Sequence, residues 1–515
     1  MNDSTTDTKT ERNSLTVMLL TLASRLLGIV KAKVIGSVFG SGEVADVINF
    51  TYNIPNNFRK LFAEGAMSSA YIPVFSRQIG EGKRKDANNL LNVLFTWQLI
   101  FFVVLVVLAV CTGDSFIAAI SDFGSDGAAL GGKLLPFFFA FLGEISIATI
   151  YNSMLQCHKR FFAASFSPLL FSLVVIFGIW YGRTPMSMAL SVAVGGFAQL
   201  LYSAMQVRRL GYRLHVSLRP DQGSFPIVIR RWMIVTYASV IQIISQQVSY
   251  SFASMLPPGS VTAFSNATIF WQTPYGIFFT AIATVFFPLM SQSWAKGDVT
   301  TLARTTGVGM EYLATFMIPS AIIIGTLSQE FVSSILQGGA FTMEIAMLTS
   351  RVVRTFLWGM LFIAWYGFLQ KLCYSIDRYR LVLALTAVQS GIDIALSYLF
   401  IRSGYGAPAL AAAGNIAFLV VLVILLYEMR DVYRIMKDLR LWKALGKILA
   451  ANIPLAIVSS AYASHGFTWW QSGSTWANFG RTCLIAGGMA SITLASYRLF
   501  HVPFLAVLKK HSPDR

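Results

Sequence analysis

The chain has 515 residues, of which 55% are hydrophobic and only 12% are charged. Ordinary globular domains carry about 25% charged residues, so this composition, with a mean hydropathy of +0.62, excludes a soluble protein. The formal net charge of +17 could suggest nucleic-acid binding, but the basic residues gather in particular loops between apolar segments. We therefore interpret the charge as membrane topology and expect no nucleic-acid partner.

Apolar segments of about 18 residues or more recur along the chain, which is the signal of transmembrane helices. The sequence predicts an all-α polytopic membrane protein with about fourteen transmembrane helices. The expected spans are 14–40, 44–76, 87–112, 133–157, 163–182, 186–207, 226–255, 260–294, 304–327, 344–370, 380–401, 407–428, 447–464 and 477–500.

Lysine and arginine are distributed unevenly between the two sides of this map. The loops on one side and both ends of the chain hold most of the basic residues. The opposite loops and span edges hold only Lys133, Arg183 and Arg402, and they include the acidic segment 114–126. By the positive-inside rule, both termini are predicted to be cytoplasmic.

A weak internal repeat suggests how the spans are grouped. The second span contains Pro55 and Pro73, the eighth contains Pro274 and Pro288, and a basic loop with glycine follows each. Repeats of this kind are typical of transporters, so we expect two lobes of about six helices each, with two added C-terminal helices. The expected parts are a cytoplasmic tail (1–13), an N-lobe (14–207), a cytoplasmic linker (208–225), a C-lobe (226–428), an interfacial amphipathic helix (429–446), the last two spans (447–500) and a cytoplasmic tail (501–515).

The first two spans differ from the others because they carry charge at membrane depth. A charge there costs at least ~2.5 kcal/mol and marks a functional site by default. The basic residues are Arg25, Lys31, Lys33, Arg59 and Lys60, and the acidic ones are Asp46 and Glu64. Because basic residues are in excess, the sequence predicts a cationic cavity that binds an anion, and arginine forks suit phosphate oxygens.

The polar residues of the second span lie on one face of a helix. The members of this stripe are Asp46, Asn49, Asn53, Asn56, Asn57, Lys60 and Glu64. A stripe of this kind faces a water-filled cavity or another helix and not lipid. Pro55 interrupts the span, and we interpret it as a hinge.

No enzyme site is recognisable in the sequence. It contains no GxxxxGK[ST], HExxH or GxSxG motif, and its four cysteines form no CxxC pair. The sequence therefore predicts a transporter without a cofactor or metal site. Uphill transport would be driven by the membrane potential or an ion gradient.

The stretch SRLLGIVKAKVIGSVFGSGEVADVINFTYNIPNNFRKLFAEGAMSSAYIPVF resembles the MurJ/MviN family of lipid II flippases, within the multidrug/oligosaccharidyl-lipid/polysaccharide exporter superfamily. The resemblance implies a V-shaped pair of lobes around a central cationic cavity. It also implies a protein of the bacterial inner membrane that flips lipid II, an undecaprenyl-pyrophosphate-linked disaccharide-pentapeptide, to the periplasmic leaflet for cell-wall synthesis. The expected mechanism is alternating access.

The resemblance also assigns roles to residues. The family's cavity arginines fall on Arg25, on Lys31 as a conservative substitution, and on Arg59, while its aspartate falls on Asp46. We expect the three basic residues to bind the pyrophosphate, and Asp46 to pair with a cavity base when the headgroup is absent. The expected cavity or coupling residues are Asp46, Lys33, Lys60, Glu64 and Asn56.

The eighth span departs from the family pattern. Where family members often carry an Asp-Arg pair and a nearby Glu, this chain has Thr268, Ile269 and Gln272. The cavity then lacks a C-lobe arginine. Either the N-lobe holds the headgroup alone, or another base compensates, such as Lys33, Lys60 or Arg354.

Other functions stay open at this stage. The chain could flip another polyprenyl-pyrophosphate-linked glycan, such as an O-antigen unit. A cation-coupled drug exporter fits less well, because its cavity should be acidic. A third alternative is a non-transporting scaffold for cell-wall enzymes. The expected partners are lipid II, membrane lipids and the cell-wall synthesis machinery.

Overall fold

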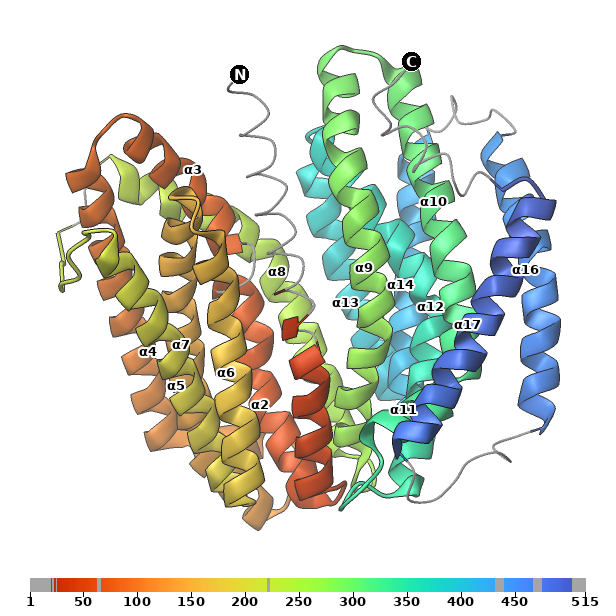
Figure 1. Ribbon diagram of the computed structural model, residues 1–515, viewed down its shortest axis with the longest axis horizontal. Helices are drawn as coiled ribbons and strands as arrows, with labels where there is room; N and C mark the ends of the chain where they lie inside the picture. Colours follow the sequence, from red (N-terminus) through yellow and green to blue (C-terminus); the bar gives the residue numbers. More distant parts are fainter. Residues whose placement is uncertain are drawn as a thin grey trace. The chain divides into compact units, whose positions relative to one another are not determined.

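The structure is a computed structural model that describes residues 20, 23–24, 26–62, 66–219, 223–430, 440–465 and 475–502. Its helices are shown in Figure 1. They are α2 (Glu43–Phe62), α3 (Ala66–Gly80), α4 (Arg84–Ile120), α5 (Ser125–Cys157), α6 (Phe161–Gly182), α7 (Pro185–Arg209), α8 (Ser224–Ser254), α9 (Ser260–Ala295), α10 (Val299–Thr326), α11 (Ser328–Leu336), α12 (Met343–Ser375), α13 (Tyr379–Arg402), α14 (Ala407–Glu428), α16 (Arg440–His465) and α17 (Thr475–Leu499). Residues 26–39 are also helical.

The described ranges contain one isolated β-bridge, between Gly338 and Phe341, and are otherwise helices and their connections. Ten of the described helices are long and apolar enough to cross a membrane. The other expected spans do not meet this criterion. They are the first span, of which residues 26–39 are helical, the second span (α2 with α3), α8 and α17. The predicted class, an all-α polytopic membrane protein, is confirmed. The expected tail 1–13 and half of the expected interfacial helix 429–446, residues 431–439, lie outside the described residues.

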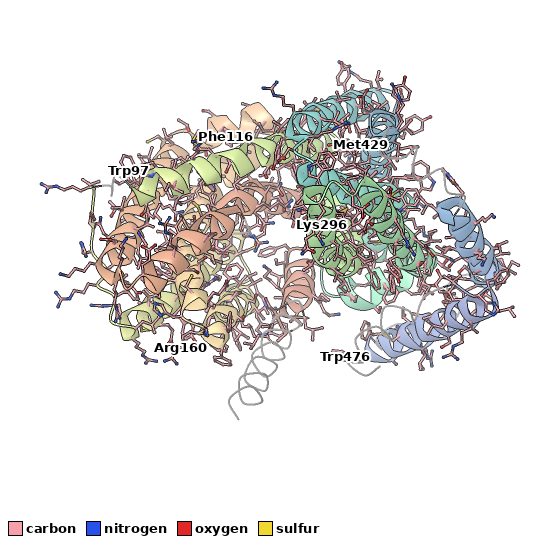
Figure 2. The ribbon with its side chains drawn as sticks, turned by 90° about the horizontal axis from the view of Figure 1, so that it is seen from above. Trp97, Phe116, Arg160, Lys296, Met429 and Trp476 are labelled. Carbon is pink, nitrogen blue, oxygen red and sulfur yellow. The ribbon has the colours of Figure 1, made fainter. Side chains whose placement is uncertain are left out.

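The helices carry large apolar side chains on exposed surfaces. Trp97 and Phe116 of α4 are 49% and 40% exposed, and Trp476 at the start of α17 is 85% exposed (Figure 2). In a soluble protein such extended apolar surface would mark a binding interface. On a helix of the length and hydropathy of α4 it is the surface that faces lipid.

The chain divides into two compact units. The first contains Met1–Thr262 with Gly338–Thr342, and the second contains Ala263–Gln337 with Met343–Arg515. α8, which the sequence analysis placed in the C-lobe, packs against α2, α3 and α4 of the first unit. The expected lobe boundaries stay a prediction.

α5 is the central helix of the first unit, because α2, α3, α4, α6 and α7 all pack against it. A helix that is apolar on every side is expected to be buried in this way. Its buried residues Leu134, Phe138 and Phe141 form one cluster with Ile48 of α2 and Met188 of α7. The first unit is therefore built around the side chains of a single helix.

The backbones of α4 and α5 approach closely at two glycines. A Cβ atom added to Gly113 would lie 2.8 Å from the carbonyl oxygen of Gly132, and one added to Gly132 would lie 2.5 Å from the backbone nitrogen of Asp114. Small residues at a helix crossing permit such an approach in a membrane. At this point either helix has room only for glycine.

In the second unit, α12 packs against α10 and α14, and the last two helices pack onto α10. The hydroxyl group of Tyr497 on α17 donates to the carbonyl oxygen of Thr315 on α10 at 2.8 Å and accepts from the amide of Asn452 on α16 at 3.0 Å. All three residues are buried. A polar bond network inside an apolar bundle therefore fixes α16 and α17 to the unit.

We expect Gly132→Ala to destabilise the protein. The new methyl group would collide with α4, and overpacking of this kind costs about 1–3 kcal/mol. Gly488→Ala is the matched control, since Gly488 lies within α17 and a Cβ there meets nothing within 4 Å. Thermal unfolding of the purified protein in detergent measures both variants. Equal midpoints for Gly132→Ala and the wild type would contradict the close approach.

Candidate functional site

The predicted binding residues belong to the first unit, on the helix at 26–39 and on α2. Arg25 and Glu64 lie outside the described residues. The structure does describe the other predicted residues, namely Lys31, Lys33, Asp46, Pro55, Asn56, Arg59 and Lys60. Their surroundings fall into two groups, one around the carboxylate of Asp46 and one around the ammonium of Lys31.

The carboxylate of Asp46 caps the start of α9. Its side chain is only 3% exposed. One oxygen, Oδ2, accepts a hydrogen bond from the backbone nitrogen of Gly259 at 2.7 Å. The other, Oδ1, accepts from the backbone nitrogen and the hydroxyl group of Thr262, at 2.8 and 2.6 Å. The first turn of a helix has free N–H groups and a partial positive charge, so a carboxylate there is stabilising. Both oxygens thus accept hydrogen bonds from this turn, and no lysine or arginine takes part in these contacts.

The rest of the polar stripe on α2 continues toward α8 and the same turn. The amide of Asn49 donates to the hydroxyl oxygen of Thr262 at 3.1 Å and to the carbonyl oxygen of Ala45 at 2.9 Å. Further along, the ammonium of Lys60 donates to the side-chain oxygen of Gln246 on α8 at 3.0 Å. At Asn49 and Lys60 the stripe therefore contacts other helices of the first unit.

Pro55 lies inside α2, and the helix is continuous across it. Proline has no N–H group, so the carbonyl of Thr51, four residues earlier, loses its helical partner. Pro55 and Thr51 are both buried. Asn56 and Arg59, which follow Pro55, are half-buried. The role of Pro55 as a hinge stays a prediction.

An aromatic cluster surrounds the ammonium group of Lys31. The Nζ atom lies 4.9 Å from the ring centroid of Phe171 and 5.7 Å from that of Tyr52. Phe141 stacks on Phe171 at 4.7 Å, and Phe138 meets Tyr52 edge-on at 5.5 Å. We call these four rings the aromatic seat. A cation over ring faces is stabilised by about 0.5–2 kcal/mol, and the rings do not neutralise it. The aromatic seat therefore places no opposite charge beside the ammonium of Lys31.

The sequence analysis missed the aromatic seat. Tyr52 lies on α2, Phe138 and Phe141 lie on α5, and Phe171 lies on α6. In the sequence, phenylalanines within apolar spans are indistinguishable from lipid-facing ones. The available signal was Tyr52, an aromatic residue in the span that follows the one with Lys31, because an aromatic ring is a possible cation–π partner of a lysine.

The departures in the eighth span lie in the second unit, on α9. The hydroxyl group of Thr268 donates to the carbonyl oxygen of Phe264 in its own helix at 3.0 Å. Ile269 and Gln272 are exposed. These positions supply no positive charge. Among the described residues, no group of three or more His, Cys, Asp or Glu side chains could hold a metal ion.

Comparison with known proteins decides the family. The sequence model of the family described as "Lipid II flippase MurJ" matches residues 35–479. The chain belongs to the MurJ family of lipid II flippases. It is 32% identical over 415 residues to the "Probable lipid II flippase MurJ" of Borreliella burgdorferi, an alignment that covers 80% of this chain and 82% of that one. It is 25% identical to the protein of the same description from Rhizobium tropici, over 78% and 76% of the two chains.

Solved structures of MurJ and of related transporters share the fold. The structure described as "Lipid II flippase MurJ, inward closed conformation" has a TM-score of 0.75 and 20% identity, and the match covers 96% of this chain and 99% of that one. An inward-facing multidrug resistance MATE family transporter of the MOP superfamily has a TM-score of 0.69 and 13% identity, over 81% and 96%. The resemblance seen in the sequence is confirmed. The family favours lipid II as the substrate over another glycan or a drug.

We expect Asp46→Ala to destabilise the protein. The variant leaves the backbone N–H groups of Gly259 and Thr262 buried without an acceptor, which costs about 1–3 kcal/mol for each group. Asp46→Asn should lose less, because one oxygen remains. Glu43→Gln is the control, as Glu43 is an exposed acidic residue in the same first turn of α2. If thermal unfolding of Asp46→Ala matched that of Glu43→Gln, the capping role would be wrong.

The aromatic seat predicts a loss of transport in Phe171→Leu. Leucine fills similar space but has no ring face for the ammonium of Lys31, so about 1 kcal/mol of cation–π stabilisation is lost. We expect the rate of lipid II flipping to fall about fivefold, and Phe171→Tyr to restore it. Phe177→Leu, at an exposed position of the same helix, should flip lipid II at the wild-type rate. A Phe171→Leu rate equal to that of Phe177→Leu would argue against the seat.

Proposed function

We propose that this protein carries lipid II from the cytoplasmic to the periplasmic leaflet by alternating access, with the pyrophosphate held by basic residues of the first unit. Membership in the MurJ family supports lipid II as the substrate. The observation that carries the binding site is the ammonium of Lys31 on its aromatic seat. In the described part of the chain, no carboxylate forms an ion pair with it.

A pyrophosphate is a good ligand for such a site. Lys31 provides a point charge, and Arg59, together with Arg25 of the preceding span, provides planar forks that can bond two oxygens at once. A hydrogen bond to a charged group contributes about 1.5–3 kcal/mol. The N-lobe bases alone can therefore hold the headgroup, which matches the lack of a base at Thr268, Ile269 and Gln272.

The membrane potential is a sufficient source of energy for outward transport. Moving one elementary charge through 100 mV changes the free energy by ~2.3 kcal/mol. The cytoplasm is negative, so the outward movement of an anionic headgroup is downhill. The bound anion must still prefer one conformation over the other, because a ligand shifts an equilibrium only through its differential affinity. We also propose that the protein acts in the bacterial inner membrane, with both termini in the cytoplasm.

The test is rescue of a bacterium depleted of its own lipid II flippase. We expect the wild type and Arg402→Ala to restore growth, since Arg402 is exposed at the end of α13. Lys31→Ala, Arg59→Ala and Arg25→Ala should fail, and Lys31→Arg should rescue in part. The readout is the fraction of lipid II accessible to a membrane-impermeant hydrolase added from outside.

Two outcomes separate the parts of this proposal. If the wild type leaves lipid II on the cytoplasmic face, the function is wrong. If the wild type moves it outward and the alanine variants at the three basic positions do so equally well, the function stands and the binding site is wrong.

A further inference from the structure

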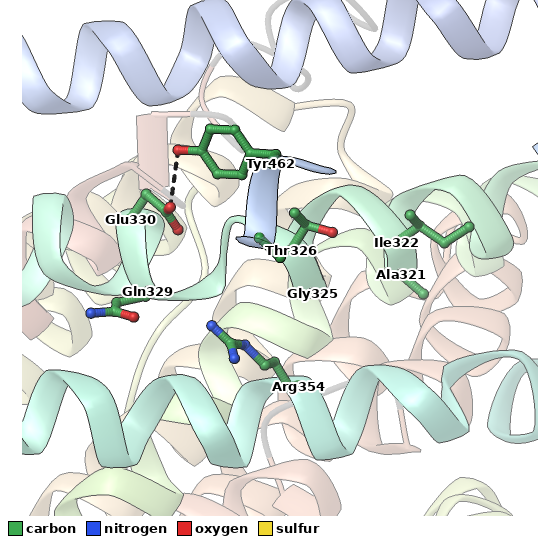
Figure 3. Close-up of a pocket in the computed structure, with 9 residues that line it drawn as sticks. Ala321, Ile322, Gly325, Thr326, Gln329, Glu330, Arg354 and Tyr462 are labelled. Carbon is green, nitrogen blue, oxygen red and sulfur yellow. Dashed lines mark hydrogen bonds between the residues drawn. The ribbon is translucent and has the colours of Figure 1, made fainter. Parts of the chain in front are cut away.

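The second unit contains a pocket that the flipping mechanism does not use. Its volume is about 550 Å³, and it lies between the last turns of α10, the start of α11, α12 and α16 (Figure 3). Ala321, Ile322 and Gly325 of α10 form an apolar wall. The polar side chains that line it come from the end of α10 and from α11, α12 and α16.

Arg354 of α12 is the cation of this pocket. Its Nε atom donates to the hydroxyl oxygen of Ser328 at 2.7 Å, and Ser328 is fully buried. This bond fixes the plane of the guanidinium group. Figure 3 shows the group pointing away from α12 into the pocket. Its two terminal nitrogens make no hydrogen bond to any described residue, so a fork of N–H donors is available to a ligand.

The acidic residue of the pocket does not cancel this charge. Glu330 of α11 is only 4% exposed, and its Oε1 atom accepts a hydrogen bond from the hydroxyl group of Tyr462 at 3.0 Å. Burial raises the pKa of Glu330, and the nearby charge of Arg354 opposes this only in part. Its other oxygen is buried and has no hydrogen-bond partner among the described residues. Glu330 is thus bonded to Tyr462 and forms no ion pair with Arg354.

The position of the pocket indicates where such an anion comes from. α10 is long and apolar enough to cross a membrane and ends at Thr326, and α11 follows outside the span. The pocket therefore lies where a span meets the headgroup region. Phospholipid phosphates lie at that level, and the apolar wall on α10 provides a surface for the first part of an acyl chain.

We propose that this pocket binds the phosphate group of a membrane phospholipid, with both terminal nitrogens of Arg354 donating to phosphate oxygens. The site is separate from the lipid II site, which lies in the first unit. It does not depend on which substrate the protein flips.

Lipid retention by the full-length protein tests this site. Native mass spectrometry would compare phosphatidylglycerol with diacylglycerol of the same chains, titrated onto the delipidated protein in detergent. The wild type should bind phosphatidylglycerol, and Arg354→Gln should bind it about tenfold more weakly, because a charge-assisted bidentate contact is lost. Arg351→Gln is the matched control, since Arg351 is exposed one turn earlier on the same helix and does not line the pocket.

A second variant keeps the test informative if Arg354→Gln fails to fold. Gly325→Leu fills the pocket while leaving Arg354 in place, and a Cβ at Gly325 meets only Leu357, at 3.9 Å. It should also weaken the binding of phosphatidylglycerol. The proposal is overturned if both variants retain this lipid as the wild type does, or if diacylglycerol binds the wild type equally tightly. Inorganic phosphate that bound as tightly as the lipid would overturn the lipid assignment.

Discussion

The carboxylate of Asp46 and the turn at Gly259–Thr262 form the contact on which the first unit depends. Inside a membrane, polar groups must find partners within the protein, because lipid supplies none. The free N–H groups at the start of α9 would otherwise be unsatisfied, and the polar stripe of α2 would face hydrocarbon. The carboxylate on α2 provides acceptors for the N–H groups of this turn, and the turn provides donors for the carboxylate. These hydrogen bonds explain why a helix as polar as α2 can lie among apolar neighbours.

The same constraint acts differently on the basic residues. Lys31 lies on ring faces that stabilise its charge without neutralising it, and Arg354 is held through one nitrogen by a neutral hydroxyl group. In both cases the cation contacts uncharged groups, and the proposed anion would meet the rest of it. A carboxylate partner would stabilise each cation more strongly, but it would also compete with a phosphate group.

The helical class and the family could be predicted from the sequence, because long apolar segments and the charged motif of the first two spans are local signals. The surroundings of the site could not. Asp46 and Gly259 are 213 residues apart, and no local pattern links them, so the sequence predicts a base as the partner of the carboxylate and gives no sign of the helix start. Phe138, Phe141 and Phe171 also look like ordinary span residues until the packing of α5 and α6 brings their rings together. In each case the missing information is tertiary packing.

The glycine crossing of α4 and α5 has a mechanical consequence. At Gly113 and Gly132 the two backbones are in contact, so neither helix can slide or rotate against the other without a collision. Small sliding movements of packed helices are one of the two common ways in which proteins change shape, and hinge bending is the other. The contact lies near the connection between α4 and α5, so this end of the helix pair is rigid. The bending that alternating access requires must then occur outside this crossing.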